Sequence, residues 1–219
     1  MRKQVLIVAG GKGERFGDKI PKQFALIKGK PVIVHTIQAF IKHSSDFIVV
    51  LPPAHFDLFQ KMTEQVFSSL NIHLTEGGNT RTESVRKGLE MIDTEGIVAI
   101  HDAVRPLVTG RLITEGFKTA EKSGSAVPVI DLKESLREIS GETNTAVDRS
   151  KFRIVQTPQF FRSELIKKAY AGIHGSSSDD ATVFEKAGHQ VRLFEGDPSN
   201  IKITVREDLI VAEALFGTF

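Results

Sequence analysis

A glycine-rich segment follows the first apolar run of the chain. Residues 10–17 read GGKGERFG, directly after Gln4–Ala9. Glycines let a backbone turn expose its N–H groups to a phosphate. The segment lacks the Gly-Lys-Ser/Thr ending of a P-loop, and Phe16 stands at the sixth position from Gly11, where a dinucleotide-binding loop needs glycine. A tight turn without a ligand is the simpler interpretation of these glycines taken alone.

Two cations favour a phosphate site over a plain turn. Arg15 lies within the glycine-rich segment, and Lys22 follows it closely. Attack at a phosphorus atom places negative charge on the phosphate oxygens, and preorganised cations stabilise that charge. Either cation alone is most simply a solvated surface side chain, but together with the loop they predict a polyphosphate site. Its loop residues are Gly10, Gly11 and Gly13.

A second glycine loop occupies residues 76–85, which read EGGNTRTESV. Paired glycines let the backbone approach a flat ligand such as a nucleotide base. Thr80 and Thr82 have a competing interpretation as caps of the following helix, with Glu83 completing a capping box. The better binding candidates of this loop are Gly77, Gly78 and Ser84.

Asp102 follows the apolar strand predicted over Ile97–His101. A carboxylate at this point suits Mg²⁺, which prefers few carboxylates together with phosphate oxygens and water. Arg105 could bind a second phosphate with two parallel hydrogen bonds. A buried salt bridge between Asp102 and Arg105 is the structural alternative. We expect His101 to be a structural residue at the end of the strand rather than a base.

The elements that position these residues alternate between strand-like and helix-like patterns, which is typical of βαβ units with a mostly parallel sheet. We predict a Rossmann-like, three-layer α/β sandwich, whose ligands bind beyond the carboxyl ends of the strands. The predicted strands are Gln4–Ala9, Phe47–Leu51, a strand near Ile72–Leu74, Ile97–His101, Ser125–Val129 and Val191–Phe194. The predicted helices are Pro31–Lys42, Phe56–Leu70, Thr82–Ile92, Leu112–Lys122 and Ser163–Gly172.

Residues 133–148 break this alternation. Two polar, strand-compatible runs, Ser135–Ile139 and Thr145–Asp148, flank a turn at 140–142, which predicts a projecting β-hairpin. Such an arm cannot bury itself alone, so we expect it to pair with a second subunit. We interpret residues 1–219 as one domain with a dimerisation arm at about 133–150.

Composition excludes several classes of protein. Lys and Arg total 29 against 27 Asp and Glu, so the chain lacks the strong basic excess of a nucleic-acid binder. It has no cysteine, which excludes disulfides, thiolate zinc sites and cysteine nucleophiles. The N-terminal apolar run is shorter than the ~7–15 residues of a signal-peptide core. No segment approaches the ~20 apolar residues of a membrane span, so we expect a cytoplasmic protein with no membrane partner.

Seven short motifs follow one another along the chain. They are residues 9–15 (AGGKGER), 21–23 (PKQ), 77–81 (GGNTR), 101–106 (HDAVRP), 147–149 (VDR), 157–160 (TPQF) and 200–202 (NIK). Taken together, these motifs resemble the 2-C-methyl-D-erythritol 4-phosphate cytidylyltransferases of the non-mevalonate isoprenoid pathway. The resemblance covers essentially the whole chain, and seven ordered motifs are far more specific than any one of them.

The resemblance implies a Mg²⁺-dependent transfer, or one dependent on another divalent cation. The phosphate of methylerythritol phosphate attacks the α-phosphorus of CTP, and pyrophosphate leaves without a covalent enzyme intermediate. Arg15 and Lys22 would neutralise the triphosphate and stabilise the transition state, and Lys202 would reach the α-phosphate. Asp102 would lie near Mg²⁺, which the phosphates mostly hold. Cytosine and ribose would be surrounded by Ala9, Gly10, Gly77, Gly78, Asn79 and Ser84.

The acceptor site implied by the resemblance includes Arg105 and Arg149. Because the arm exchanges between subunits in this family, Arg149 would act in the active site of the partner of a homodimer. The family often has an Asp-Thr pair soon after Pro-Val that contacts the acceptor phosphate. Direct counting places Leu132 at that threonine, whereas a shift of three places Ser135 there, and we favour Ser135 because it keeps a hydroxyl.

Two other functions compete with this interpretation. A ribitol-5-phosphate cytidylyltransferase has the same fold, but the stretch at 147–149 looks more like the methylerythritol enzymes. A nucleotide-binding protein without catalysis is the alternative from a different class. Such a regulator would not need every transition-state cation, and all of them are present here.

Overall fold

A mixed, mostly parallel sheet forms the centre of the molecule. The computed structural model of the chain describes residues 1–10, 21–64, 66–93, 95–173 and 175–216. Within these residues the strand order is β10-β7-β11-β6-β1-β4-β5, and β12 also pairs with β7. The strands are β1 (Lys3–Val8), β4 (Asp46–Leu51), β5 (Asn71–Glu76), β6 (Ile97–Asp102), β7 (Ser125–Asp131), β10 (Arg153–Val155), β11 (Gln159–Arg162) and β12 (Leu193–Glu195).

The register of the parallel strands brings their carboxyl ends to one edge of the sheet. Val8 at the end of β1 pairs with Asp102 of β6 on one side and with Val50 of β4 on the other. The interior of β6 is buried along its whole length, as expected for a strand covered on both faces. The segments that follow β1, β4, β5 and β6 therefore meet beyond this edge, where ligands bind in open α/β sheets.

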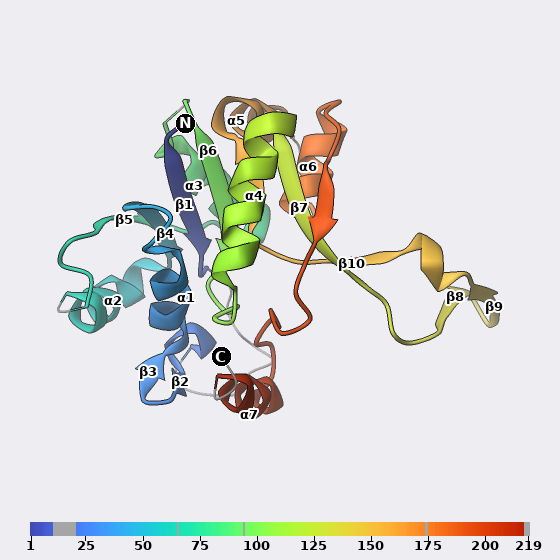
Figure 1. Cartoon of the computed structure of the whole chain (residues 1–219), viewed down its shortest axis with the longest axis horizontal. Helices are drawn as coiled ribbons and strands as arrows, with labels where there is room; N and C mark the ends of the chain where they lie inside the picture. The colour runs from blue at the N-terminus through green and yellow to red at the C-terminus, as the bar shows by residue number, and fades with distance from the viewer. Residues whose placement is uncertain (11–20, 65, 94, 174, 217–219) are drawn as a thin grey trace.

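Helices cover both faces of the sheet (Figure 1). Alternate residues of β1 show this, because Val5 and Ile7 belong to one buried cluster while Leu6 and Val8 belong to another. The first cluster includes side chains of α1, α2 and α4, and the second includes those of α3, α5 and α6. The helices are α1 (Val32–Phe40), α2 (Phe56–Thr63), α3 (Arg81–Glu90), α4 (Gly110–Ser123), α5 (Ser163–Gly172), α6 (Asp180–Lys186) and α7 (Arg206–Leu215).

A two-stranded hairpin projects from this body, as Figure 1 shows. It consists of β8 (Leu136–Ser140) and β9 (Thr143–Val147), which pair antiparallel. A short helical turn at Arg149–Lys151 leads from it to β10. A second small ribbon is formed by β2 (Leu26–Ile27) and β3 (Lys30–Pro31). The predicted fold class, a three-layer α/β sandwich with a projecting hairpin, is confirmed.

Several predicted boundaries are wrong. The helix predicted over Phe56–Leu70 ends at Thr63, whose hydroxyl donates to the carbonyl of Phe59 at 2.8 Å, and residues 66–70 are not helical. Pro31 precedes α1 instead of opening it. The last strand begins at Leu193 rather than Val191. Among the described residues, no helix is long and apolar enough to cross a membrane.

Candidate active site

A cavity of about 820 Å³ lies beyond the carboxyl ends of the central parallel strands. Its walls come from segments that follow β1, β4, β5 and β6, together with a segment that precedes α7. The described residues that line it are Val8, Ala9, Gly10, Lys22, Gln23, Pro52, Pro53, Gly77, Gly78, Asn79, Thr80, Arg81, Ser84, Asp102, Val104, Lys202 and Thr204.

Most of the predicted nucleotide residues meet in this cavity. Those that line it are Ala9, Gly10, Gly77, Gly78, Asn79 and Ser84. Gly11, Gly13 and Arg15 lie outside the described residues. A β-carbon on Gly77 would lie 3.1 Å from the Ser84 hydroxyl oxygen and 3.6 Å from the α-carbon of Gly10. The two glycines therefore bring two backbone segments together in a narrow wall that could approach a flat ring closely.

The start of α3 holds the second glycine loop in place. The Thr80 hydroxyl accepts a hydrogen bond from the N–H of Glu83 at 3.1 Å, so Thr80 is the helix cap that the sequence predicts. Ser84 donates through its hydroxyl to the carbonyl of Thr80 at 2.9 Å and accepts from the N–H of Gly78 at 3.0 Å. Ser84 thereby fixes the loop as well as lining the cavity.

Two details of the predicted cap are wrong. The Glu83 carboxylate accepts from the N–H of Asn79 at 2.6 Å, one residue before the cap, so the expected capping box does not close on Thr80. Thr82 does not cap the helix. Its hydroxyl accepts from the N–H of Ser177 at 2.9 Å instead. Sequence spacing predicts the loop and its cap, but these two partners depend on the folded backbone.

Asp102 is the electrostatic centre of the cavity. Its Oδ2 lies 2.9 Å from Lys202 Nζ and 3.6 Å from Arg105 Nε, and its Oδ1 lies 3.3 Å from Arg81 Nε. Burial alone would raise the pKa of Asp102, but the positive charges of these three partners outweigh it and hold the pKa well below its ordinary value. Asp102 is therefore a carboxylate at any working pH. The salt bridge between Asp102 and Arg105, which is the structural alternative to a phosphate contact of Arg105, is present.

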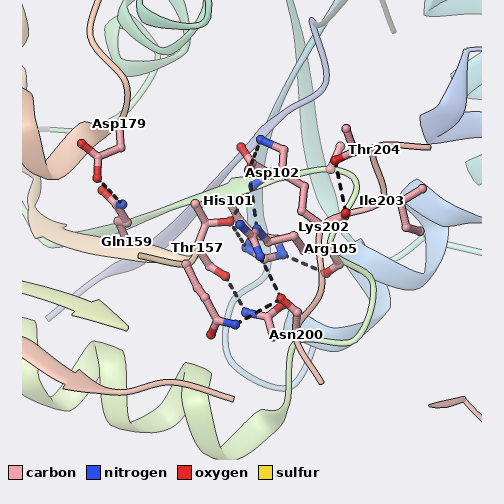
Figure 2. A network of polar contacts seen from close by, with 12 residues as sticks. His101, Asp102, Arg105, Thr157, Gln159, Asp179, Asn200, Lys202, Ile203 and Thr204 are labelled. Atoms are coloured by element: carbon pink, nitrogen blue, oxygen red, sulfur yellow. Dashed lines mark hydrogen bonds and ion pairs between the residues drawn. The ribbon is translucent and has the colours of Figure 1, made fainter. Parts of the chain in front are cut away.

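The cavity wall carries more positive than negative charge. Lys22, Arg81 and Lys202 line it together with Asp102, the one acidic residue among the described lining residues. Lys22 donates through Nζ to the carbonyl of Ile203 at 3.1 Å, and Figure 2 shows Lys202 and Arg105 pointing toward Asp102. An anion with several charges, such as a triphosphate, matches this arrangement.

His101 helps to fix the backbone around Asp102 through a network of hydrogen bonds. Its Nε2 lies 3.1 Å from the carbonyl of Arg105, which can only accept, so Nε2 bears the proton. The Thr157 hydroxyl then donates to Nδ1 at 3.0 Å and accepts from the N–H of Asp102 at 3.1 Å. Burial lowers the pKa of His101 to about 3, so the ring is neutral. The structural role predicted for His101 is confirmed.

This buried neutral histidine predicts an acid-sensitive fold. The unfolded chain protonates His101 below its ordinary pKa of 6.5, whereas the folded chain does so only near 3. Stability is therefore complete above pH 6.5 and falls as the pH drops, with a contribution from His101 of about 2 kcal/mol lost between about pH 7 and 5. Asp102 does not enter this window, because its lowered pKa removes stability only below the unfolded value of 3.8.

Urea unfolding of wild type and His101→Gln at both pH values measures this contribution. We expect the pH dependence of the free energy of unfolding to be flatter in the variant. His43→Gln is the matched control, because burial also lowers the pKa of His43 but this residue is only half-buried, whereas His101 is fully buried. An equal pH dependence in wild type and His101→Gln would contradict the assignment.

The predicted acceptor residues are not all brought together in one chain. Arg105 is largely buried, and its Nη1 donates to the carbonyl of Asn200 at 2.8 Å beside Asp102. Arg149 and Ser135 are exposed residues at the base of the projecting hairpin, where Arg149 Nη1 donates to the carbonyl of Lys133. Neither lines the cavity of its own chain.

Arg81 is a site residue that sequence reasoning does not single out. It is the first residue of α3, it lines the cavity, and it contacts Asp102. One signal points to it, because a cation is unfavourable in the first turn of a helix unless a specific anion compensates it. Thr157 also has a role, in binding His101 and the Asp102 backbone, that the TPQF motif alone does not reveal.

The acidic residues present fit a metal only in company with a substrate. The described residues contain no group of three or more His, Cys, Asp or Glu side chains suited to holding a metal ion. Mg²⁺ commonly takes one or two carboxylates and fills its other positions with substrate phosphates and water. Asp102 therefore fits a cation that arrives with a triphosphate, and the donor set does not fit a metal held by the protein alone.

Comparisons with known proteins identify the family of the chain. The family model of 2-C-methyl-D-erythritol 4-phosphate cytidylyltransferase matches residues 4–218. Enzymes of that name from Bacteroides thetaiotaomicron and Azobacteroides pseudotrichonymphae are 41% and 42% identical, each over 98% of this chain and over 100% and 98% of their own length. The crystal structure of the enzyme from Thermus thermophilus is 34% identical, with a TM-score of 0.81 over 98% of both chains. The chain thus belongs to the 2-C-methyl-D-erythritol 4-phosphate cytidylyltransferase family.

Proposed function

We propose that the chain transfers CMP from CTP to 2-C-methyl-D-erythritol 4-phosphate and releases pyrophosphate. The observation that supports this most strongly is the cavity in which the glycine wall at Gly10 and Gly77 adjoins Lys22, Lys202 and Asp102. A pyrimidine base against the glycine wall would place its triphosphate among the cations. The family match over nearly the whole chain supports the same reaction.

The reaction needs a phosphate oxygen of the acceptor to form a bond to the α-phosphorus of CTP. The bond from that phosphorus to the α–β bridging oxygen breaks, and pyrophosphate leaves with the bonding electrons. No protein proton is required, so the side chains act by position and charge. Lys22 and Lys202 stabilise the charge that develops on the phosphates, and we propose the same role for Arg15.

We propose Mg²⁺, or another divalent cation, as the cofactor. Asp102 is the residue that would hold it, with phosphate oxygens as the other ligands. When bound, the cation neutralises phosphate charge and makes the α-phosphorus more open to attack. Arg81, Arg105 and Lys202 lie close to Asp102, so their charges reduce its repulsion of a triphosphate without abolishing it.

For the acceptor we propose Arg105 from one subunit and Arg149 from the arm of its partner in a homodimer, with the hydroxyl of Ser135 near the acceptor phosphate. The base of the arm supports a subunit contact, because it exposes three large apolar side chains close to Arg149. These are Phe152, Ile154 and Val155, which are 45%, 44% and 39% exposed.

Pyrophosphate release tests the proposal. The purified chain is given CTP and Mg²⁺ with methylerythritol phosphate or ribitol 5-phosphate in separate reactions, and Lys22→Met serves as the site control. We expect turnover with methylerythritol phosphate that Lys22→Met largely abolishes. Turnover with ribitol 5-phosphate alone would overturn the proposed acceptor, and silence with both would leave a nucleotide-binding protein without this catalysis.

A further inference from the structure

Arg81 contacts two buried carboxylates, Asp102 at the cavity and Asp180 in the core. Its Nη1 and Nη2 donate to the two oxygens of Asp180 at 2.9 and 2.8 Å, while its Nε lies 3.3 Å from Asp102 Oδ1. The guanidinium is planar, so the two-pronged contact with Asp180 also fixes the direction of Nε. Its position thereby sets the orientation of Asp102.

The anchor of Arg81 lies in the protein core. Asp180 is fully buried in the first turn of α6, and the hydroxyl of Tyr170 on α5 donates to its Oδ1 at 2.5 Å. Burial and the neighbouring carboxylate raise the pKa of Tyr170, so the tyrosine stays protonated as this bond requires. Asp180 does more than begin a helix, because the neighbouring Asp179 already caps it.

The contacts of Asp102 divide between its two oxygens. Arg81 contacts Oδ1, whereas Lys202 and Arg105 contact Oδ2. Arg81 is also the first residue of α3. Thr80, which caps this helix, and Ser84, whose hydroxyl donates to the carbonyl of Thr80, hold the second glycine loop. A single anchored helix end therefore fixes both the wall for the base and the orientation of Asp102.

We propose that Arg81, anchored by Asp180 and Tyr170, is a positioning residue of the transfer reaction. It holds Asp102 with Oδ2 directed to Lys202, and it acts through Asp102 rather than on the reacting atoms. This inference rests on the proposed function. Without Asp180, the guanidinium of Arg81 can turn and donate two hydrogen bonds to Asp102, which occupies both carboxylate oxygens.

The test compares Asp180→Asn and Tyr170→Phe with wild type in steady-state pyrophosphate release. For Asp180→Asn we expect kcat to fall roughly 10- to 100-fold, with KM for CTP changed less than about threefold, because the loss concerns a group that orients another. Tyr170→Phe keeps the two-pronged ion pair and is expected to show a smaller loss in the same parameter. Arg81→Lys, which keeps the charge, should retain more kcat than Arg81→Gln.

A matched control separates positioning from simple loosening of α6. Asp179→Ala removes the cap of the same helix, where Asp179 Oδ1 accepts from the N–H of Thr182 at 3.0 Å, but it touches neither Arg81 nor Asp102. We expect it to lower the melting temperature and to leave kcat within about twofold of wild type. The ¹⁵Nε–¹H NMR signal of Arg81, assigned by its loss in Arg81→Lys, should shift in Asp180→Asn and stay in place in Asp179→Ala.

The outcomes are distinct. No turnover by wild type would refute the proposed function itself. Turnover by wild type with kcat unchanged in folded Asp180→Asn and Tyr170→Phe would refute the positioning role alone. Equal losses of kcat in Asp179→Ala and Asp180→Asn, in proportion to their lowered melting temperatures, would show that Asp180 acts only by stabilising the fold.

Discussion

Asp102→Asn is expected to lower kcat for CMP transfer by about a hundred- to a thousandfold, the range that follows removal of one preorganised group that stabilises a transition state. The substitution keeps the size of the side chain and its backbone contact with Thr157. It removes the charge that we propose to sit beside the metal and the phosphates. The loss should appear in kcat at saturating CTP and acceptor.

Binding of CTP without metal should move in the opposite direction. In wild type the Asp102 carboxylate repels the triphosphate and engages Lys202 at 2.9 Å. Asparagine ends that repulsion and releases Lys202 toward the phosphates, so calorimetry in EDTA is expected to show affinity at least equal to wild type. A variant that binds CTP more tightly but has a lower kcat would show that the Asp102 carboxylate stabilises the transition state rather than bound CTP.

Asp46→Asn is the matched control for this prediction. It removes the same charge and also breaks an ion pair, because Asp46 lies 2.7 Å from Arg2. Asp46 begins β4, at the opposite end of that strand from the cavity. We expect its kcat and its CTP affinity to equal those of wild type. A full kcat in Asp102→Asn would contradict the role proposed for this carboxylate.

The sequence predicts the site where chemistry follows a strand directly. Asp102 could be placed because four apolar residues precede His101, and strands buried on both faces have that pattern. The second glycine loop could be placed because Gly77 and Gly78 follow a predicted strand, at the edge of the sheet where ligands bind. In these cases the local sequence alone determines both the element and the place where it ends.

Contacts between distant segments could not be predicted in this way. Arg81 lies 21 residues from Asp102 and 99 from Asp180, and no spacing rule relates residues that far apart. The short strand β11 is also hidden, because its four residues follow Pro158 and pair antiparallel with β6 and β7. β11 forms because it can pair with both β6 and β7, and the local sequence pattern carries no information about those partners.

The arm raises the same problem between chains, and paired variants are expected to show which chain Arg149 serves. Lys22→Met disables a site and Arg149→Ala disables an arm, so each homodimer should be inactive. In a purified heterodimer of the two, the chain with an intact Lys22 receives an intact arm from its partner. If Arg149 acts across a twofold dimer, about half of wild-type activity should return.

The reciprocal heterodimer makes this result decisive, because it reverses the expectation. It pairs a wild-type chain with one that carries both Lys22→Met and Arg149→Ala. If Arg149 acts across the dimer, this second heterodimer has no complete site. If Arg149 acts within its own chain, the wild-type subunit of the second heterodimer stays active, and the first heterodimer has no activity. The exposed Arg149 lies outside the cavity of its own chain, on an arm that projects away from the sheet (Figure 1). We therefore expect activity in the first pair and almost none in the second, measured as pyrophosphate release at equal protein concentration.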